Sequence, residues 1–251
     1  MDASKYYDAR HRLHLYCNPM NKEKLERFIR LLRLKPGMEV LDIACGKGEF
    51  LIRLAELYSI RGVGVDISPY CIRDALNKLE ARAPNAQIRF LLMDAKDYKP
   101  EHGQLFDLSA CMGASWIYGG HRETLRALRD MTKVGGIIVV GEPYWLKEPD
   151  PEYLAADSLR KQDYACSHRE NIEIGEDEGL TCIYTIVSDH DDWDHYETLG
   201  WWSIDEYARE NPDDPDLLEI LAREEREKKI YLKWGRDTMG WAIYAFRKRE
   251  T

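Results

Sequence analysis

Two acidic residues and a pair of glycines carry the strongest chemical signal in the chain. Asp42 follows an apolar run that begins at Val40, and the turn after it contains Gly46 and Gly48. Asp66 ends a second apolar run 24 residues later. Glycines let a ligand approach the backbone closely, and an acid after the second strand can hydrogen-bond a ribose. The pattern predicts a nucleotide pocket at the carboxyl end of a parallel sheet.

The spacing of these residues favours S-adenosylmethionine over a dinucleotide. A dinucleotide fingerprint has the form G-x-G-x-x-G, and Leu51 stands at its third glycine position. Asp42 would repel a pyrophosphate, whereas a cofactor with an amino-acid head and a positive sulfonium would tolerate it. Acid and glycine turns also occur in unrelated α/β proteins, so the dinucleotide interpretation stays open at this point.

The composition is that of an ordinary globular protein. The chain has 251 residues, of which 44% are hydrophobic, and this length can form one domain with a large core. We find neither an apolar run of the roughly 20 residues that a membrane helix needs nor an apolar signal region. We therefore expect a cytoplasmic protein without a membrane partner. The six cysteines form no C-x-x-C pair, so we expect no bound metal.

Charge is unevenly distributed along the chain. The net charge of −9 argues against nucleic acid as a partner. Residues 142–219 contain 23 acidic and 5 basic residues, whereas the remainder contains 22 acidic and 31 basic residues. This difference suggests a mildly basic nucleotide region and an acidic cap, although a solvated acidic face would explain the same run.

Apolar segments and helical patterns alternate through the first part of the chain. Alternation of this kind is typical of a doubly wound parallel sheet. Later segments are rich in proline and acids before two final apolar runs. We predict strands at 38–43, 61–66, 88–93, 106–112, 137–140, 181–188 and 239–247, and helices at 19–34, 47–58, 69–82, 124–132, 202–211 and 214–234.

At the level of these motifs, residues 38–142 resemble the class I S-adenosylmethionine-dependent methyltransferases. The resemblance implies a Rossmann-like α/β sheet of seven strands in the order 3-2-1-4-5-7-6, with strand seven antiparallel. It assigns the turn after strand one to the methionine part, the acid of strand two to the ribose, the residues after strand three to the adenine, and the end of strand four to the methyl group. The implied cofactor residues are Asp42, Ala44, Cys45, Gly46, Gly48, Asp66, Ile67, Asp94, Ala95, Cys111 and Gly113. The family often has glycine where Ala44 stands. Alanine at this position allows the turn fewer backbone conformations than glycine would.

A closer resemblance extends over almost the whole chain. It rests on segments such as His11–His14, Gly113–Ile117, Gly141–Trp145 and Gly235–Trp241, and it points to a bacterial group of class I methyltransferases without an agreed substrate. It implies a single domain. Its parts are a cofactor-covering segment at 1–37, a cofactor-binding core at 38–142, and substrate cap elements at 143–180 and 190–236. The cap is a helical insertion between strands five and six, with a further helical segment before strand seven.

Three residues are candidates for the base that would take a proton from the methyl acceptor. Glu142 follows strand five, Tyr144 lies two residues later, and His14 lies in the N-terminal segment. Each also has a structural interpretation. Glu142 could bind a backbone amide, Tyr144 could belong to the core of the cap, and His14 could be a packed histidine.

Tryptophans are the most prominent residues of the cap. Trp145 and Trp193, with Trp116 after strand four, are candidate walls of a substrate pocket. Aromatic faces beside acids bind cations, so we expect a small neutral or cationic acceptor such as an amine or a thiol. These side chains could equally be ordinary core.

Methyl transfer to a small molecule is therefore the function that the sequence favours. A regulatory protein that binds S-adenosylmethionine without catalysis is one alternative, and an NAD-dependent oxidoreductase is a weaker one, because the third glycine is missing.

Overall fold

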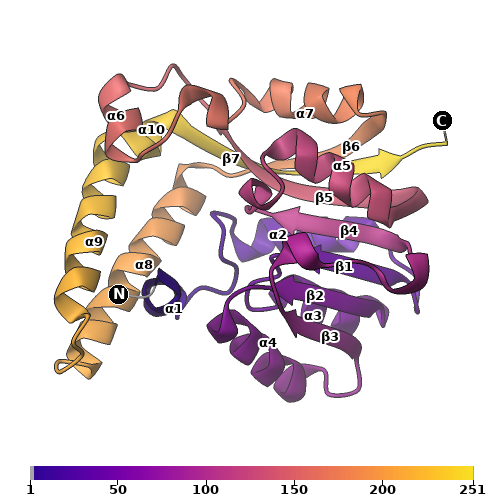
Figure 1. The fold of residues 1–251 in the computed structure, drawn as a ribbon, viewed down its shortest axis with the longest axis horizontal. Helices are drawn as coiled ribbons and strands as arrows, with labels where there is room; N and C mark the ends of the chain where they lie inside the picture. The colour runs from indigo at the N-terminus through magenta and orange to yellow at the C-terminus, as the bar shows by residue number, and fades with distance from the viewer. Residues whose placement is uncertain (1–2, 251) are drawn as a thin grey trace.

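A seven-stranded mixed sheet forms the centre of the molecule (Figure 1). The computed structural model describes residues 3–250. The strand order is β3-β2-β1-β4-β5-β7-β6, and β7 runs antiparallel to both of its neighbours, as the sequence predicted. The strands are β1 (Glu39–Ile43), β2 (Arg61–Asp66), β3 (Gln87–Leu92), β4 (Phe106–Met112), β5 (Thr132–Trp145), β6 (Leu180–Val187) and β7 (Met239–Lys248).

Helices cover both faces of this sheet, which is why its central strands are apolar on both sides. On one face, α2 (Lys22–Leu32) and α3 (Glu49–Tyr58) pack on side chains such as Val40 and Val139. On the other, α5 (His121–Met131) and α7 (His168–Asp177) pack on side chains such as Val140. The helix α4 (Pro69–Arg82) contacts α3 and β3.

A helical lobe stands beside the sheet at the left of Figure 1. It consists of α1 (Ala3–His11), α8 (His190–Glu210) and α9 (Leu217–Ile230), which enclose a small core around Tyr6, Ile204 and Ile220. Above this lobe lie α6 (Pro151–Ala156) and α10 (Arg236–Thr238), and a wide π-type turn at Tyr231–Gly235 joins α9 to α10. The lobe therefore combines the first segment of the chain with segments almost 200 residues later.

The structure differs from the sequence prediction in the length of β5. We expected this strand to end before Glu142, but it continues to Trp145. The pairing with β4 stops at Met112 and Gly141, whereas the pairing with β7 continues to Trp145 and Met239. Because β4 no longer occupies that side of β5, Pro143 can lie in the strand without losing a ladder hydrogen bond. Glu142 is thus held inside a strand, directly beyond the end of β4.

Two helices also differ from the prediction because polar contacts specify them. α8 begins at His190 rather than near residue 202, since Asp189 and Asp192 form a reciprocal cap at its first turn. α1 was not predicted, because its sequence has almost no apolar stripe. Ion pairs with the lobe hold it instead.

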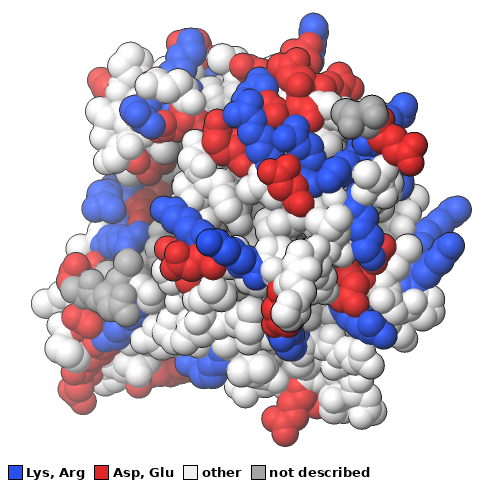
Figure 2. All heavy atoms as spheres, turned by 45° about the vertical axis from the view of Figure 1, so that its right-hand side comes forward, with Lys and Arg blue, Asp and Glu red and all other residues white. Residues whose placement is uncertain are grey.

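Charged side chains are mixed on the surface rather than segregated. On the face that Figure 2 shows, basic and acidic side chains lie side by side. Arg122 and Arg126 of the basic part of the chain both pair with Glu178 of the acidic part. The charge difference read from the sequence is thus partly neutralised by tertiary contacts. Over residues 3–250, the structure contains no helix with the length and apolarity that crossing a membrane requires.

We expect Gly175→Ala to destabilise the fold. An added Cβ at Gly175 of α7 would lie 2.3 Å from Cε1 of Phe246 in β7, so the helix or the ring must shift. Overpacking of this kind costs about 1–3 kcal/mol of unfolding free energy, which urea denaturation measures. Gly235→Ala is the matched control, because its nearest contact would be an ordinary 3.4 Å, and it should change stability by less than about 0.5 kcal/mol. Equal effects of the two substitutions would contradict the packing argument.

Candidate functional site

The turn between β1 and α3 requires unusual backbone conformations. Ala44, Gly46 and Gly48 have φ angles of 53°, 53° and 71°. An alanine in this region costs about 1–2 kcal/mol, so the turn holds Ala44 in a conformation that glycine would adopt without strain. Gly48 also lies against the sheet, where a Cβ would approach Cζ of Phe90 to 2.5 Å. The turn therefore brings bare backbone to the carboxyl end of the sheet, as a ligand-binding turn does.

Asp66 at the end of β2 fixes this turn. One carboxylate oxygen accepts the amide of Gly46 at 2.8 Å, and the other accepts the amide of Ser68 at 2.8 Å. Each oxygen keeps a further lone pair for a ligand. The sequence placed Asp66 at a ribose, and the structure shows that it also connects the ends of β1 and β2.

Two neighbouring acids make the pocket suitable for a cation. Asp42 is buried, and burial together with the nearby Asp66 raises its pKa well above the usual range. Burial also raises the pKa of Asp66, although its backbone hydrogen bonds oppose that shift. Two buried carboxylates that resist ionisation are stabilised by a positive ligand and destabilised by a negative one. The ammonium and sulfonium of S-adenosylmethionine fit this requirement, and a pyrophosphate does not.

The remaining predicted cofactor residues lie along the same edge of the sheet. Asp94 caps the short turn after β3 by accepting the amide of Lys96 at 2.9 Å, and the adjacent Ala95 is buried. Cys111 is buried near the end of β4, and Gly113 follows it with a φ of 85°. The other two predicted positions flank the first two strands: Cys45 is buried and Ile67 is exposed.

A buried polar cluster lies beyond the end of β4. Ser115 Oγ donates to Glu142 Oε2 at 3.0 Å, and His121 Nδ1 lies 3.6 Å from Glu142 Oε1. His121 Nε2 lies 3.0 Å from the carbonyl oxygen of Asn171, so this nitrogen carries the proton that is donated. Neither His121 Nδ1 nor Glu142 Oε1 has a hydrogen-bond partner among the described residues.

The polar side chains next to this cluster are hydrogen-bonded to one another or to the backbone. The amide nitrogen of Asn171 donates to the carbonyl of Pro143 at 3.1 Å and contacts the hydroxyl of Tyr244 at 3.2 Å. That hydroxyl also lies 2.9 Å from Nδ1 of His168. Tyr144, one of the predicted bases, packs its ring against His168 at 5.5 Å. It is therefore buried beside the cluster rather than bonded to Glu142.

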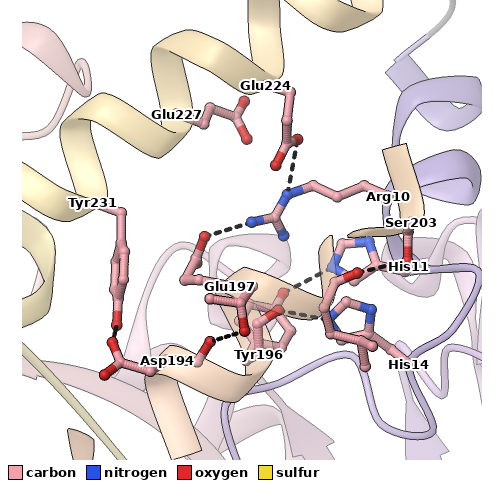
Figure 3. A network of polar contacts seen from close by, with 12 residues as sticks. Arg10, His11, His14, Asp194, Tyr196, Glu197, Ser203, Glu224, Glu227 and Tyr231 are labelled. Atoms are coloured by element: carbon pink, nitrogen blue, oxygen red, sulfur yellow. Dashed lines mark hydrogen bonds and ion pairs between the residues drawn. The ribbon is translucent and has the colours of Figure 1, made fainter. Parts of the chain in front are cut away.

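A second buried network anchors α1 in the helical lobe (Figure 3). The Arg10 guanidinium lies between two carboxylates, with Nη2 2.5 Å from Glu197 of α8 and Nε 3.3 Å from Glu224 of α9. The hydroxyl of Tyr6 reaches Glu224 at 2.6 Å. Burial raises the pKa of Glu197 to about 7, and the adjacent Arg10 opposes this shift. α1 is thus held by these buried charges together with the apolar contacts of the Tyr6 ring.

Two histidines continue this network toward the cofactor turn. His11 Nε2 lies 2.8 Å from the hydroxyl of Tyr196, and His14 Nε2 donates to the carbonyl of Tyr196 at 2.8 Å (Figure 3). Lys47, inside the glycine turn, donates to the carbonyl of His11 at 2.7 Å and pairs with Asp74 at 3.4 Å. The cofactor turn is therefore connected through α1 to α8 and α9.

The predicted aromatic walls occupy three different environments. Trp145 is buried, with its ring against Tyr153 and Tyr164 and its Nε1 donating to the carbonyl of Lys161 at 2.8 Å. Trp193 is partly buried and packs on the core of the sheet. Trp116 is 73% exposed at the loop after β4. The structure does not bring these rings together.

Sequence reasoning did not single out His121, Arg10 and Lys47, which the structure places in the buried polar networks. The signal for His121 was its position after Gly119-Gly120, which marks the start of a helix near the end of β4. Arg10 and Lys47 gave no signal, because their partners lie far away in the sequence. Across residues 3–250, no three His, Cys, Asp or Glu side chains converge as a metal site requires.

Comparison with known proteins identifies the family. A model described as a methyltransferase domain matches residues 40–136. YjhP, an uncharacterised protein of Escherichia coli K12, is 31% identical over 243 residues, which cover 96% of each chain. A S-adenosylmethionine-dependent methyltransferase of Geobacter sulfurreducens, solved with S-adenosylhomocysteine, is similar with a TM-score of 0.90, at 30% identity over 98% of each chain. One from Thiobacillus denitrificans, also with S-adenosylhomocysteine, gives 0.89 at 31% identity over 99% of this chain and 100% of its own.

The chain therefore belongs to the class I S-adenosylmethionine-dependent methyltransferases, and it transfers a methyl group from that cofactor. The predictions of fold, family and cofactor are confirmed. The two alternatives, a non-catalytic binder and an NAD-dependent oxidoreductase, are not favoured.

We expect the docking of α1 to weaken in acid. Burial lowers the pKa of His11 to about 3 and that of His14 to about 4, so both are neutral in the folded protein. The unfolded chain protonates them below about pH 6.5. Their contribution to stability is complete above that pH and is lost as the pH falls toward about 4, by up to about 1.4 kcal/mol per pH unit for each. Hydrogen exchange of the α1 and α8 amides measures this loss.

The exposed His102 provides the control for this experiment. His102→Asn should leave the acid dependence unchanged, whereas His14→Asn should reduce it. An acid dependence that is the same in the wild type and in His14→Asn would contradict the assignment.

Proposed function

We propose that the protein methylates a small-molecule acceptor that binds beyond the end of β4, beneath the helical lobe. The observation that carries this proposal is the buried Glu142 carboxylate, which keeps one oxygen without a partner among the described residues. Buried polar atoms are rarely left unpaired, and such exceptions are found at functional sites. When bound, S-adenosylmethionine supplies an activated methyl group on its sulfonium.

We assign the cofactor to the edge formed by β1, β2, β3 and β4. The turn containing Ala44, Cys45, Gly46 and Gly48 offers backbone to the methionine part, and Asp42 faces its positive charge. Asp66 and Ile67 lie beside the ribose, and Asp94 and Ala95 lie beside the adenine. Cys111 and Gly113 lie near the methyl group. The raised pKa values of Asp42 and Asp66 support this assignment, because they require a cationic partner.

The acceptor side is assigned to Glu142 as the group that finally holds the proton of the acceptor. His14 and Tyr144 have positioning roles in this proposal, because His14 is bonded to α8 and Tyr144 is packed on His168. Trp116 is exposed enough to contact an acceptor, whereas Trp145 and Trp193 support the cap and the lobe. Residues 1–37 form the cofactor cover, 38–142 the core, and 143–180 with 190–236 the cap.

An acceptor panel tests the proposed function. The purified protein is incubated with S-adenosylmethionine and with sets of small amines, hydroxyl compounds, thiols and carboxylic acids, and the formation of S-adenosylhomocysteine is followed. We expect turnover with a neutral or cationic acceptor and none with carboxylic acids, because the cap carries buried carboxylates such as Glu197 and Glu224. Turnover confined to anionic acceptors, or to protein acceptors in a control incubation, would refute the proposal.

We expect Asp42→Asn to stabilise the free protein and to weaken cofactor binding. An acid with a raised pKa stabilises the fold below its unfolded pKa and loses that contribution as the pH rises. Near neutral pH the unfolded chain therefore releases the Asp42 proton more readily than the folded chain, which costs stability. The amide removes this cost, so the melting temperature should rise. Without the carboxylate, S-adenosylmethionine should bind about 1–3 kcal/mol more weakly by calorimetry. A variant that binds the cofactor as tightly as the wild type would contradict the assignment of Asp42.

A further inference from the structure

Glu142 and His121 face each other with no hydrogen between their nearest atoms. His121 donates from Nε2 to the carbonyl of Asn171, so in the neutral ring Nδ1 carries a lone pair and no proton. That lone pair faces Glu142 Oε1 at 3.6 Å, and neither atom has a partner in residues 3–250. Two lone pairs held face to face in a buried site repel each other, and a proton on either atom removes the repulsion. The pair is therefore suited to accept one proton.

No other ionisable group facing Glu142 competes for this proton near neutral pH. Cys111 on β4, Tyr244 on β7 and Tyr164 after α6 face Glu142. Burial raises the pKa of Cys111 well above its usual value and that of Tyr244 above its usual value. Burial also raises the pKa of Tyr164 to about 12. All three stay neutral near neutral pH, which leaves His121 of α5 as the ionisable neighbour of Glu142 in this cluster.

The pair is too enclosed to touch an acceptor itself. The side chains of His121 and Glu142 are only 8% and 4% exposed. Ser115 connects them to the outside, because its hydroxyl donates to Glu142 Oε2 while the residue remains partly exposed in the loop after β4. The three side chains thus form one line, from the accessible Ser115 through Glu142 to the enclosed His121.

We propose that Ser115, Glu142 and His121 form a proton relay, with Ser115 as the residue that contacts the nucleophile of the acceptor. This inference rests on the proposed function. The nucleophile gives its proton to Ser115 Oγ, while the Ser115 proton moves to Glu142 Oε2. The carboxyl group is then neutral, so its Oε1 repels the lone pair of His121 Nδ1 less than a carboxylate oxygen does. A bond forms between the nucleophile and the methyl carbon as the carbon–sulfur bond breaks, and sulfur keeps the electron pair as a neutral thioether. The proton leaves to solvent after the product.

The relay defines the class of acceptor. A nucleophile needs it only if its reacting atom carries a proton that must be lost, as in a hydroxyl, a thiol or a protonated amine of any degree. A thioether has no such proton. The panel for this test therefore pairs thiols with the thioethers made from them and includes hydroxyl compounds beside them.

Kinetics of single variants test the relay. With the best acceptor of the panel, Glu142→Gln and Ser115→Ala should each lower kcat by about 10²–10⁴-fold, the usual range for general acid–base catalysis. Ser115→Thr keeps a hydroxyl and should remain within about tenfold of the wild type. Affinity for S-adenosylhomocysteine should stay unchanged in all three. Ser59→Ala is the matched control, because Ser59 is exposed between α3 and the amino end of β2, at the opposite edge of the sheet from the relay.

Three kinetic results would overturn the relay while leaving methyl transfer intact. One is full activity of Ser115→Ala, and another is equal loss in Ser115→Ala and Ser115→Thr. The third is a thioether used as well as the matching thiol. If no small molecule in the panel is methylated, the proposed function fails instead.

A spectroscopic measurement that needs no acceptor tests the relay separately from the proposed function. Nitrogen-15 spectra of the imidazoles report the protonation of each ring nitrogen of His121 in the complex with S-adenosylhomocysteine. The relay requires a neutral Nε2–H ring whose Nδ1 carries a lone pair beside Glu142. It also requires that Glu142→Gln change the Nδ1 signal more than the Nε2 signal. A ring with both nitrogens protonated would show a fixed ion pair and would overturn the proposal.

Discussion

The antiparallel pairing of β5 with β7 is the constraint on which the rest of the active edge depends. β4 stops pairing at Met112, but β7 continues to satisfy the backbone of β5 as far as Trp145. Because β5 extends beyond the end of β4, its last residues form a step at the carboxyl end of the sheet, where ligands bind in this architecture. Glu142 is the first residue on that step. The loop carrying Ser115 and the start of α5 fold against it, so all three members of the polar cluster depend on this single pairing.

Acidic side chains lie on both sides of β4, and a different species would neutralise each. We propose a proton for Glu142 on one side and a cation for Asp42 and Asp66 on the other. Both arrangements keep buried carboxylates incompletely compensated in the protein alone, which costs stability. In the proposed assignment of the cofactor to Asp42 and Asp66, a positively charged ligand would offset this cost and a pyrophosphate would increase it.

The N-terminal helix connects the glycine turn to the helical lobe. Lys47 of the glycine turn is bonded to the carbonyl of His11, and Arg10, the preceding residue, is buried between Glu197 and Glu224 (Figure 3). A buried ion pair is costly to break, because one charge is then left uncompensated. α1 therefore joins the glycine turn to α8 and α9 through buried polar contacts.

The sequence by itself determined the order of the sheet, the family and the cofactor. These features follow from local patterns, namely apolar runs of strand length, glycines at positions with positive φ, and acids at strand ends. The structure decided what local patterns do not encode. β5 lengthened because β7, almost 100 residues later, supplied its hydrogen bonds. α1 formed without an apolar stripe because its charges found partners in α8 and α9. His121 joined Glu142 because α5 begins beside the step in the sheet. These partners lie far apart in the chain and meet only once it has folded. Their charges interact strongly only because folding also buries them.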